Sequence, residues 1–187
     1  MNLPNSLTLT RIFLVPLLVV VLLTKFEGRL ILGIPKELVG AAIFGLASLT
    51  DWLDGYVARR RKQITALGQV IDPLADKLLT SAALISLVAM DLAPAWMVAV
   101  IIGREFAVTG LRSLAYARGV AVPASPLGKI KMVAQVVAIL ALILAHGQPT
   151  IRVIGDAALW VVVVAALISA ADYFRRFNSI LGPRIAD

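Results

Sequence analysis

Six long apolar segments restrict the possible folds of this chain more than any other feature. A helix that crosses a bilayer needs roughly 17–25 mostly apolar residues, and we expect such helices at residues 7–24, 33–58, 64–90, 94–117, 129–146 and 153–174. The hydrophobic content of 60% and the mean hydropathy of +0.92 also exceed those of ordinary soluble domains. The sequence therefore predicts an all-α, polytopic membrane protein whose single domain, residues 1–187, is one six-helix bundle.

The first segment carries local signals of its own. Ser6 or Thr8 is suited to cap a helix that begins after Pro4 and Asn5, and Pro16 predicts a kink partway along it. The first residues lack the basic stretch and the small-residue cleavage site of a secretory signal, so we expect them to remain in the mature protein.

The distribution of Lys and Arg predicts the orientation, because positive charge is retained on the cytoplasmic side of a membrane. Ten basic residues fall on one side: Arg59, Arg60, Arg61, Lys62, Arg118, Lys129, Lys131, Arg175, Arg176 and Arg184. Four fall on the other side: Lys25, Arg29, Lys36 and Arg152. We therefore expect both termini in the cytoplasm, with the protein in the inner (plasma) membrane. We then expect the net charge of +7 to favour contact with lipid headgroups and phosphorylated substrates. Nucleic-acid binding is not expected, because the sequence shows no basic face interspersed with aromatic residues.

Four aspartates are concentrated near the expected cytoplasmic ends of the second and third segments. Asp51 and Asp54 are spaced to share one helix face, as are Asp72 and Asp76. The short basic run at residues 59–62 makes the two helices antiparallel neighbours, which brings the four carboxylates to a similar depth. Like charges this close repel one another unless they are neutralised, and divalent cations would neutralise them.

The composition restricts which metal such a site can hold. The chain has no cysteine and one histidine, so any metal must be bound mainly by oxygen, which selects Mg²⁺, Mn²⁺ or Ca²⁺. Two such ions about 4 Å apart can clamp a diphosphate, which indicates phosphoryl-group chemistry. Gly55 and Ala58 share the face of Asp51 and Asp54 and leave room for a nucleotide. The alternative interpretation is that all of these are helix-packing residues whose acids pair with arginine.

Together these residues form a longer pattern: Asp51-x2-Asp54-Gly55-x2-Ala58-Arg59-x8-Gly68-x3-Asp72-x3-Asp76. The pattern resembles the signature of the CDP-alcohol phosphatidyltransferase family at every fixed position. The resemblance implies a six-helix membrane enzyme, a homodimer among membrane lipids, that uses two Mg²⁺ or Mn²⁺ ions to transfer a group from CDP-diacylglycerol.

The resemblance also implies roles for individual residues. The metal ligands would be Asp51, Asp54, Asp72 and Asp76, and Asp76 would in addition act as the catalytic base. The nucleotide-binding positions would be Gly55, Ala58, Arg59 and Gly68, with Thr8 near the nucleotide or phosphate end.

The remaining cations bear on the second substrate, the acceptor alcohol. Arg112, Arg118, Lys129 and Lys131 approach the expected cytoplasmic side without acidic partners on their own segments there, which suits an acceptor that carries phosphate. Contact with lipid phosphates is the alternative. Arg104 and Glu105 lie deeper and are either part of such a site or neighbours that stabilise the bundle.

Secondary motifs resemble the bacterial branch of the family that uses glycerol 3-phosphate. They are Asn2-Leu3-Pro4-Asn5-x2-Thr8-x2-Arg11, Ile71-Asp72-Pro73, Gly103-Arg104-Glu105 and Leu127-Gly128-Lys129-Ile130-Lys131. Met132 departs from the threonine expected after the second lysine. The expected reaction converts CDP-diacylglycerol and glycerol 3-phosphate to phosphatidylglycerophosphate and CMP.

Other functions stay open. Within the family, the acceptor could be inositol phosphate, phosphatidylglycerol (as in a cardiolipin synthase) or serine. A small cation transporter is the alternative from another class, although a transporter places its acids nearer the middle of the bilayer.

Overall fold

The computed structural model describes residues 3–25, 30–61, 66–117 and 126–181, with side chains for residues 10–25, 31–50, 74–113, 130–172 and 175. Its helices are α1 (Leu3–Leu23), α2 (Lys36–Arg61), α3 (Ala66–Ala89), α4 (Ala95–Ala117), α5 (Pro126–Leu144) and α6 (Pro149–Leu181). The short strands β1 (Leu30–Ile31) and β2 (Ile34–Pro35) connect α1 to α2. The predicted all-α class is confirmed.

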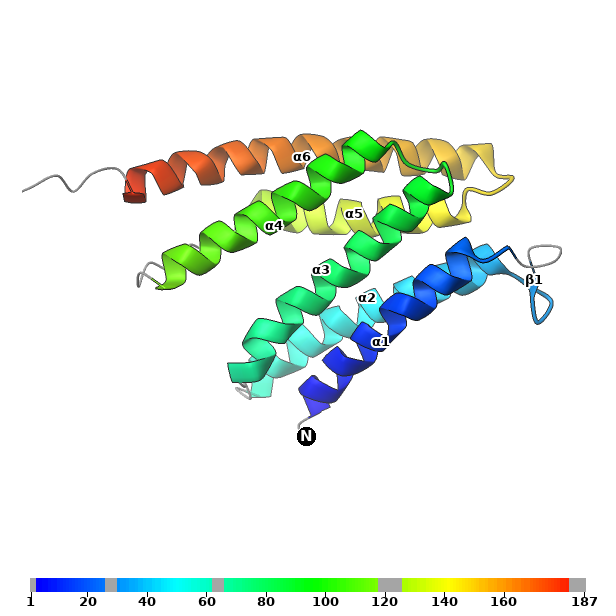
Figure 1. Ribbon diagram of the computed structural model, residues 1–187, viewed down its shortest axis with the longest axis horizontal. Helices are drawn as coiled ribbons and strands as arrows, with labels where there is room; N and C mark the ends of the chain where they lie inside the picture. The colour runs from blue at the N-terminus through cyan, green and yellow to red at the C-terminus, as the bar shows by residue number, and fades with distance from the viewer. Residues whose placement is uncertain (1–2, 26–29, 62–65, 118–125, 182–187) are drawn as a thin grey trace, which may run out of the picture.

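Helix α3 occupies the centre of the bundle. It contacts α1, α2, α4 and α5, while α6 packs along α5 and against α4. Figure 1 shows α3 crossing diagonally between α1 and α2 on one side and α4 to α6 on the other. A single apolar core joins the helices through fully buried side chains that include Leu18, Phe44, Leu87, Ile101, Leu142 and Val162. A site built on α3 can therefore receive residues from most of the other helices.

The ends of the helices differ from the predicted ones at two places. Helix α1 already begins at Leu3, with Pro4 in its first turn, where a missing N–H leaves no helical bond unmade. Ser6 and Thr8 consequently lie inside the helix, and the prediction that one of them caps it is wrong. Helix α6 continues to Leu181 and takes up part of the expected tail. The expected turn between α4 and α5 lies largely outside the described residues.

A β-hairpin replaces the expected start of the second helix. Leu32 and Gly33 both have positive φ, 50° and 81°, which is the backbone of a tight two-residue hairpin turn. Because a residue with positive φ cannot continue a right-handed helix, α2 begins only at Lys36 instead of at Gly33.

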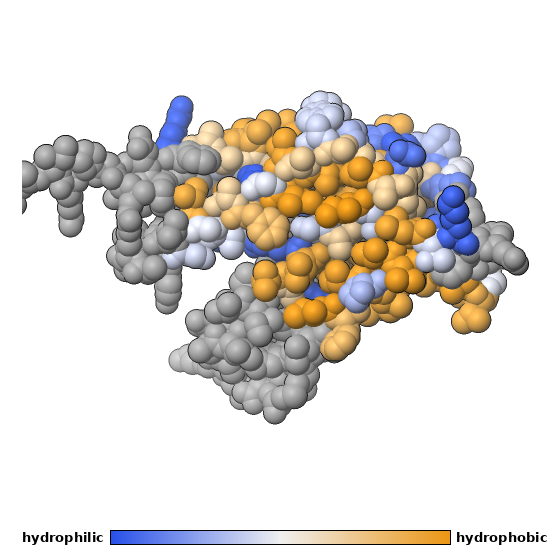
Figure 2. All heavy atoms as spheres, viewed as in Figure 1, coloured by the Kyte–Doolittle hydropathy of each residue, from blue (hydrophilic) through white to orange (hydrophobic). Residues whose placement is uncertain are grey.

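The surface of the bundle is unusually apolar. Large hydrophobic side chains are exposed on all six helices, for example Phe13 at 75%, Leu46 at 63% and Val153 at 66%. Figure 2 shows apolar side chains over most of the coloured face, with hydrophilic ones chiefly at its right-hand end. Such extensive apolar exposure is rare on a soluble monomer and typical of contact with lipid. Among the described residues, Pro149–Asp172 is long and apolar enough to cross a membrane, with a mean hydropathy of 2.3.

Candidate functional site

The four aspartates of the signature lie on two helices that contact each other. Asp51 and Asp54 are in the C-terminal half of α2, and Asp72 and Asp76 are in the N-terminal half of α3. The end of α2 and the beginning of α3 lie together at the lower left of Figure 1. Of the four side chains, that of Asp76 is among those described, and it is partly buried.

The residues predicted to bind the nucleotide lie on the same helices. Gly55, Ala58 and Arg59 follow the aspartates of α2, while Gly68 precedes those of α3. Because α2 is continuous from Lys36 to Arg61, its signature residues keep the spacing of one helix face. Thr8 lies on α1, which packs against both α2 and α3. The side chains of these residues lie outside the description, so their roles stay predictions.

Basic side chains from three helices, including its own, lie near Asp76. Lys77 on α3, Arg11 on α1 and Lys131 on α5 are all close enough to exert an electrostatic effect on its carboxylate. Arg11 lies in the first half of α1 and is only 2% exposed. The aspartate site is therefore continuous with a region of positive charge.

A buried network joins α4, α5 and α6 beside this site. Arg104 donates through Nη1 to Glu105 Oε1, at 3.3 Å, and through Nη2 to Ser169 Oγ. The same oxygen of Glu105 forms an ion pair with Lys131 Nζ. The side chains of Arg104, Glu105 and Lys131 are 10%, 18% and 6% exposed. Burying charge is costly without partners, so this network fixes the two cations in position.

The network changes the interpretation of two predicted features. Lys131 has no acidic partner on its own helix, as predicted, but Glu105 of α4 supplies one. Arg104 and Glu105 are indeed neighbours that pair, yet they also connect α4 to α5 and α6. They therefore belong to the region around Asp76 rather than only to the packing of α4.

Among the side chains that the structure describes here, positive charge exceeds negative charge. Lys77 lies within electrostatic reach of Asp76, Arg112 and Arg104. The described groups thus comprise five basic side chains, Arg11, Lys77, Arg104, Arg112 and Lys131, and two acidic ones, Asp76 and Glu105. An excess of cations near a buried site favours a multiply charged anion such as a phosphate ester. Arg118 and the side chain of Lys129, also predicted to bind the acceptor, lie outside the description.

Two members of this region, Lys77 and Ser169, were not predicted from the sequence. Lys77 could have been recognised, because an ionisable residue within an expected spanning helix is costly unless it has a partner or a function. Ser169 could not have been recognised, since a serine in an apolar helix is usually a small packing residue. Only the packing of α6 against α4 shows that it contacts Arg104.

The donor atoms of the signature suit a hard divalent cation. Four aspartates on two contacting helices offer oxygen ligands, and Glu105, the acid described beside them, is already paired with Arg104 and Lys131. Oxygen ligands of this kind are those preferred by Mg²⁺ and Mn²⁺.

Comparison with known proteins agrees with the signature. A family model described as CDP-alcohol phosphatidyltransferase matches residues 1–170. A Bacillus subtilis (strain 168) protein named CDP-diacylglycerol–glycerol-3-phosphate 3-phosphatidyltransferase is 52% identical over 183 residues, covering 94% of each chain. A Rickettsia typhi protein of the same name is 37% identical over 93% of this chain and 96% of its own. A probable phosphatidylglycerophosphate synthase of Mycobacterium tuberculosis is 38% identical over 94% of this chain and 81% of its own. The chain therefore belongs to the CDP-alcohol phosphatidyltransferase family and is a CDP-alcohol phosphotransferase.

Proposed function

We propose that this chain is a phosphatidylglycerophosphate synthase, which transfers the phosphatidyl group of CDP-diacylglycerol to sn-glycerol 3-phosphate and releases CMP. The observation that carries the proposal is the complete aspartate signature on α2 and α3, in a chain whose relatives over nearly their whole length bear this name. The cation-rich region beside Asp76 supports an acceptor that carries its own phosphate.

The aspartates would hold the metal. Asp51, Asp54, Asp72 and Asp76 present carboxylates from two contacting helices, which is suited to two divalent ions, Mg²⁺ or Mn²⁺. When bound, such ions would neutralise charge on the diphosphate and lower the pKa of the attacking hydroxyl.

Asp76 would accept the proton in the transfer step. The hydroxyl oxygen of glycerol 3-phosphate attacks the phosphorus of the phosphatidyl phosphate, and its proton passes to an Asp76 carboxylate oxygen. The new P–O bond forms as the bond between that phosphorus and the bridging oxygen breaks, and CMP leaves with the electron pair. An aspartate with an ordinary pKa of about 4 is a weak base, so the step requires an acidified hydroxyl held within hydrogen-bond reach.

The small residues of the signature would bind the cytidine end of the donor. Gly55, Ala58 and Gly68 would leave space against the backbone of α2 and α3, and Arg59 and Thr8 would contact the nucleotide or its phosphates. Gly55 and Ala58 share a helix face with Asp51 and Asp54, and Gly68 shares one with Asp72 and Asp76, which supports one continuous pocket for the CDP group.

The acceptor phosphate would bind among the cations of α4 and α5. We assign it to Arg112, Arg118, Lys129 and Lys131, and we add Arg104 because its guanidinium is held beside Lys131 through their shared partner Glu105. Arginine suits this role because its planar guanidinium can bind two phosphate oxygens at once. Glu105 and Ser169 would act as positioning residues that orient the cations.

The membrane arrangement is also part of the proposal. The whole chain would form one domain in which all six helices span the inner membrane, with both termini and the aspartates on the cytoplasmic side and a homodimer as the working unit. Exposed apolar side chains on every helix support the spanning arrangement, and the Lys and Arg distribution supports the orientation.

Release of CMP against a panel of acceptors tests the acceptor assignment. Purified protein would be incubated with CDP-diacylglycerol and Mg²⁺ or Mn²⁺, and with glycerol 3-phosphate, inositol phosphate, phosphatidylglycerol or serine. We expect CMP release with glycerol 3-phosphate and little with the other acceptors. Release with inositol phosphate but not with glycerol 3-phosphate would show that the acceptor is wrong while the family chemistry stands.

A further inference from the structure

A pocket lined by apolar and basic side chains lies at the end of the bundle away from the aspartates. It has a volume of about 370 Å³ and is bounded by the end of α1, the start of α2, the end of α3 and the turn that follows α5. Lys36, at the start of α2, lies about 23 to 27 Å along the helix axis from Asp51 and Asp54. The pocket is therefore separate from the site of the proposed reaction. We call it the distal pocket.

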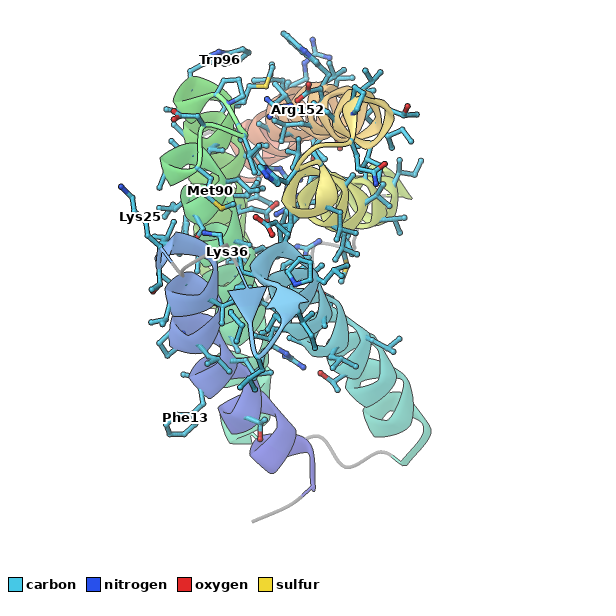
Figure 3. The ribbon with its side chains drawn as sticks, turned by 90° about the vertical axis from the view of Figure 1, so that its right-hand side faces the viewer. Phe13, Lys25, Lys36, Met90, Trp96 and Arg152 are labelled. Carbon is cyan, nitrogen blue, oxygen red and sulfur yellow. The ribbon has the colours of Figure 1, made fainter. Side chains whose placement is uncertain are left out.

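The distal pocket combines basic and apolar side chains. Its nitrogen groups come from Lys25, Lys36 and His146, and its apolar lining includes Leu22, Leu23 and Met90. No acidic side chain is among the lining residues that the structure describes. Figure 3 looks onto this end of the molecule, where Lys25, Lys36 and Met90 lie near the end of α1.

Lys36 is the fixed cation of the distal pocket. Lys36 is only 7% exposed. Its Nζ donates hydrogen bonds to the carbonyl oxygens of Leu22, at 2.8 Å, and Thr24, at 3.2 Å. These bonds hold the ammonium at the end of α1 and use two of its three donor hydrogens. A charge held in this way, with one donor remaining, is prepared to bind an anion without first being ordered.

Lys25 and His146 complete the site at its rim. Both side chains are exposed, and they come from different parts of the chain, one after α1 and the other after α5. A volume of about 370 Å³ lies within the range of small-molecule sites. Three nitrogen groups around such a space can bind the oxygens of a phosphate group.

We propose that the distal pocket binds the headgroup phosphate of an anionic phospholipid. The apolar lining decides between a lipid and a free phosphate, because Leu23, Met90 and Leu92 would contact the glycerol and the first methylenes of an acyl chain. A soluble anion would leave this apolar surface unused. In the proposed topology, this lipid belongs to the leaflet opposite the aspartates.

Native mass spectrometry of the purified full chain tests the proposal. Dioleoyl phosphatidylglycerol would be added at increasing molar ratios to wild-type protein, to the double variant Lys25→Gln/His146→Gln and to the control Arg152→Gln. Arg152 is a basic residue at the same end of the molecule, outside the distal pocket. We expect the double variant to lose affinity for one lipid by roughly fivefold or more, as fits the loss of about 1 kcal/mol, while the control binds as wild type does.

Three results would overturn the proposal. Equal lipid binding by the double variant would show that the pocket is not the site, and an equal loss in Arg152→Gln would indicate general surface charge. Displacement of the lipid by millimolar inorganic phosphate would identify a site for a free anion. CMP release by the double variant, measured in parallel, should remain near wild type, because the distal pocket does not touch the aspartates.

Discussion

Asp76 is the point where the two halves of the site meet. It belongs to the aspartate signature, and it also lies within electrostatic reach of Arg11 and Lys131 from two other helices. A residue that binds metal and accepts a proton must be close to both substrates. Asp76 fits this requirement, because it belongs to the aspartate signature and lies near the cations of other helices.

Replacement of Asp76 by asparagine tests its role as the base. We expect Asp76→Asn to lower turnover by about 100-fold or more, because general-base catalysis contributes roughly that much, and to weaken CDP-diacylglycerol binding less than Asp54→Asn does. CMP release and donor binding are the measurements. Asp156→Asn, which removes an acid paired with Arg152 at the other end, should leave turnover unchanged. Comparable turnover in Asp76→Asn and wild type would remove Asp76 as the base.

Ser169 provides a test of the acceptor site. Loss of its hydroxyl would release one side of the Arg104 guanidinium, so we expect Ser169→Ala to raise the KM for glycerol 3-phosphate about three- to tenfold. The KM for CDP-diacylglycerol should change less, and Ser169→Thr should restore much of the loss.

Ser86→Ala is the matched control for this substitution. Ser86 is also buried, but its hydroxyl bonds to the carbonyl of Ala82 on its own helix. An equal rise of both KM values in Ser169→Ala, or an effect as large in Ser86→Ala, would indicate a general loss of packing rather than a role in the acceptor site.

The predictability of the site differs from residue to residue. The aspartates stand out in the sequence because helical spacing puts each pair on one helix face, and charge within an apolar segment is costly without a partner or a function. The pairing of Lys131 with Glu105 and the contact of Ser169 with Arg104 depend on how α4, α5 and α6 pack. No pattern along the chain encodes that packing, so those residues were identified only from the structure.

Close packing of α5 and α6 supports the site at the scale of the helices. Gly155 of α6 faces Leu142 of α5, and a Cβ at residue 155 would lie 2.7 Å from the Leu142 side chain and 3.2 Å from its backbone nitrogen. Small residues permit such close approach between membrane helices. Since α5 carries Lys131 and α6 carries Ser169, this packing also sets the distance between the two.

A single methyl group should disturb this pair of helices. We expect Gly155→Ala to destabilise the protein by about 1–3 kcal/mol, as overpacking does, and to lower the temperature of thermal unfolding in detergent. Gly110→Ala on α4 is the control, because a Cβ there meets no atom within 4 Å and alanine favours a helix. An unchanged unfolding temperature in Gly155→Ala would contradict the close approach of α5 and α6.

Helix positions were predicted better than helix connections. The hydropathy pattern located all six helices because apolar length and flanking charge are properties of the sequence itself. The hairpin before α2 was missed because its turn places Leu32 at positive φ, where glycine or asparagine is expected. Local propensity did not indicate it.

At the scale of the whole molecule, the charged residues of the proposed site lower the hydropathy of two helices. Arg104, Glu105 and Arg112 interrupt the apolar sequence of α4, and Asp76 and Lys77 interrupt that of α3. In α4 these three charges keep the described stretch below a strict hydropathy criterion, whereas the described apolar stretches of α1 and α5, Thr10–Leu23 and Ile130–Leu144, are shorter than that criterion requires. Asp76, Lys77, Arg104 and Glu105 are partly buried, and charges that are buried among helices in this way do not prevent a helix from spanning a bilayer.

Labelling of single cysteines tests the proposed topology. The chain has no native cysteine, so Gln148→Cys, between α5 and α6, and Arg175→Cys, near the end of α6, each give a unique thiol at an exposed position. In spheroplasts, a membrane-impermeant maleimide should label residue 148 at once and residue 175 only after the membrane is opened. Labelling of both residues, or of residue 175 alone, in intact spheroplasts would contradict the orientation.

The central claim is the transfer of a phosphatidyl group to glycerol 3-phosphate. The most direct measurement follows radiolabelled glycerol 3-phosphate into lipid, together with CMP release, by purified protein in vesicles that contain CDP-diacylglycerol and Mg²⁺ or Mn²⁺. We predict phosphatidylglycerophosphate and CMP in equal amounts, with both products strongly reduced in Asp76→Asn. CMP release without incorporation of the label into lipid, or incorporation that Asp76→Asn leaves unchanged, would contradict the account.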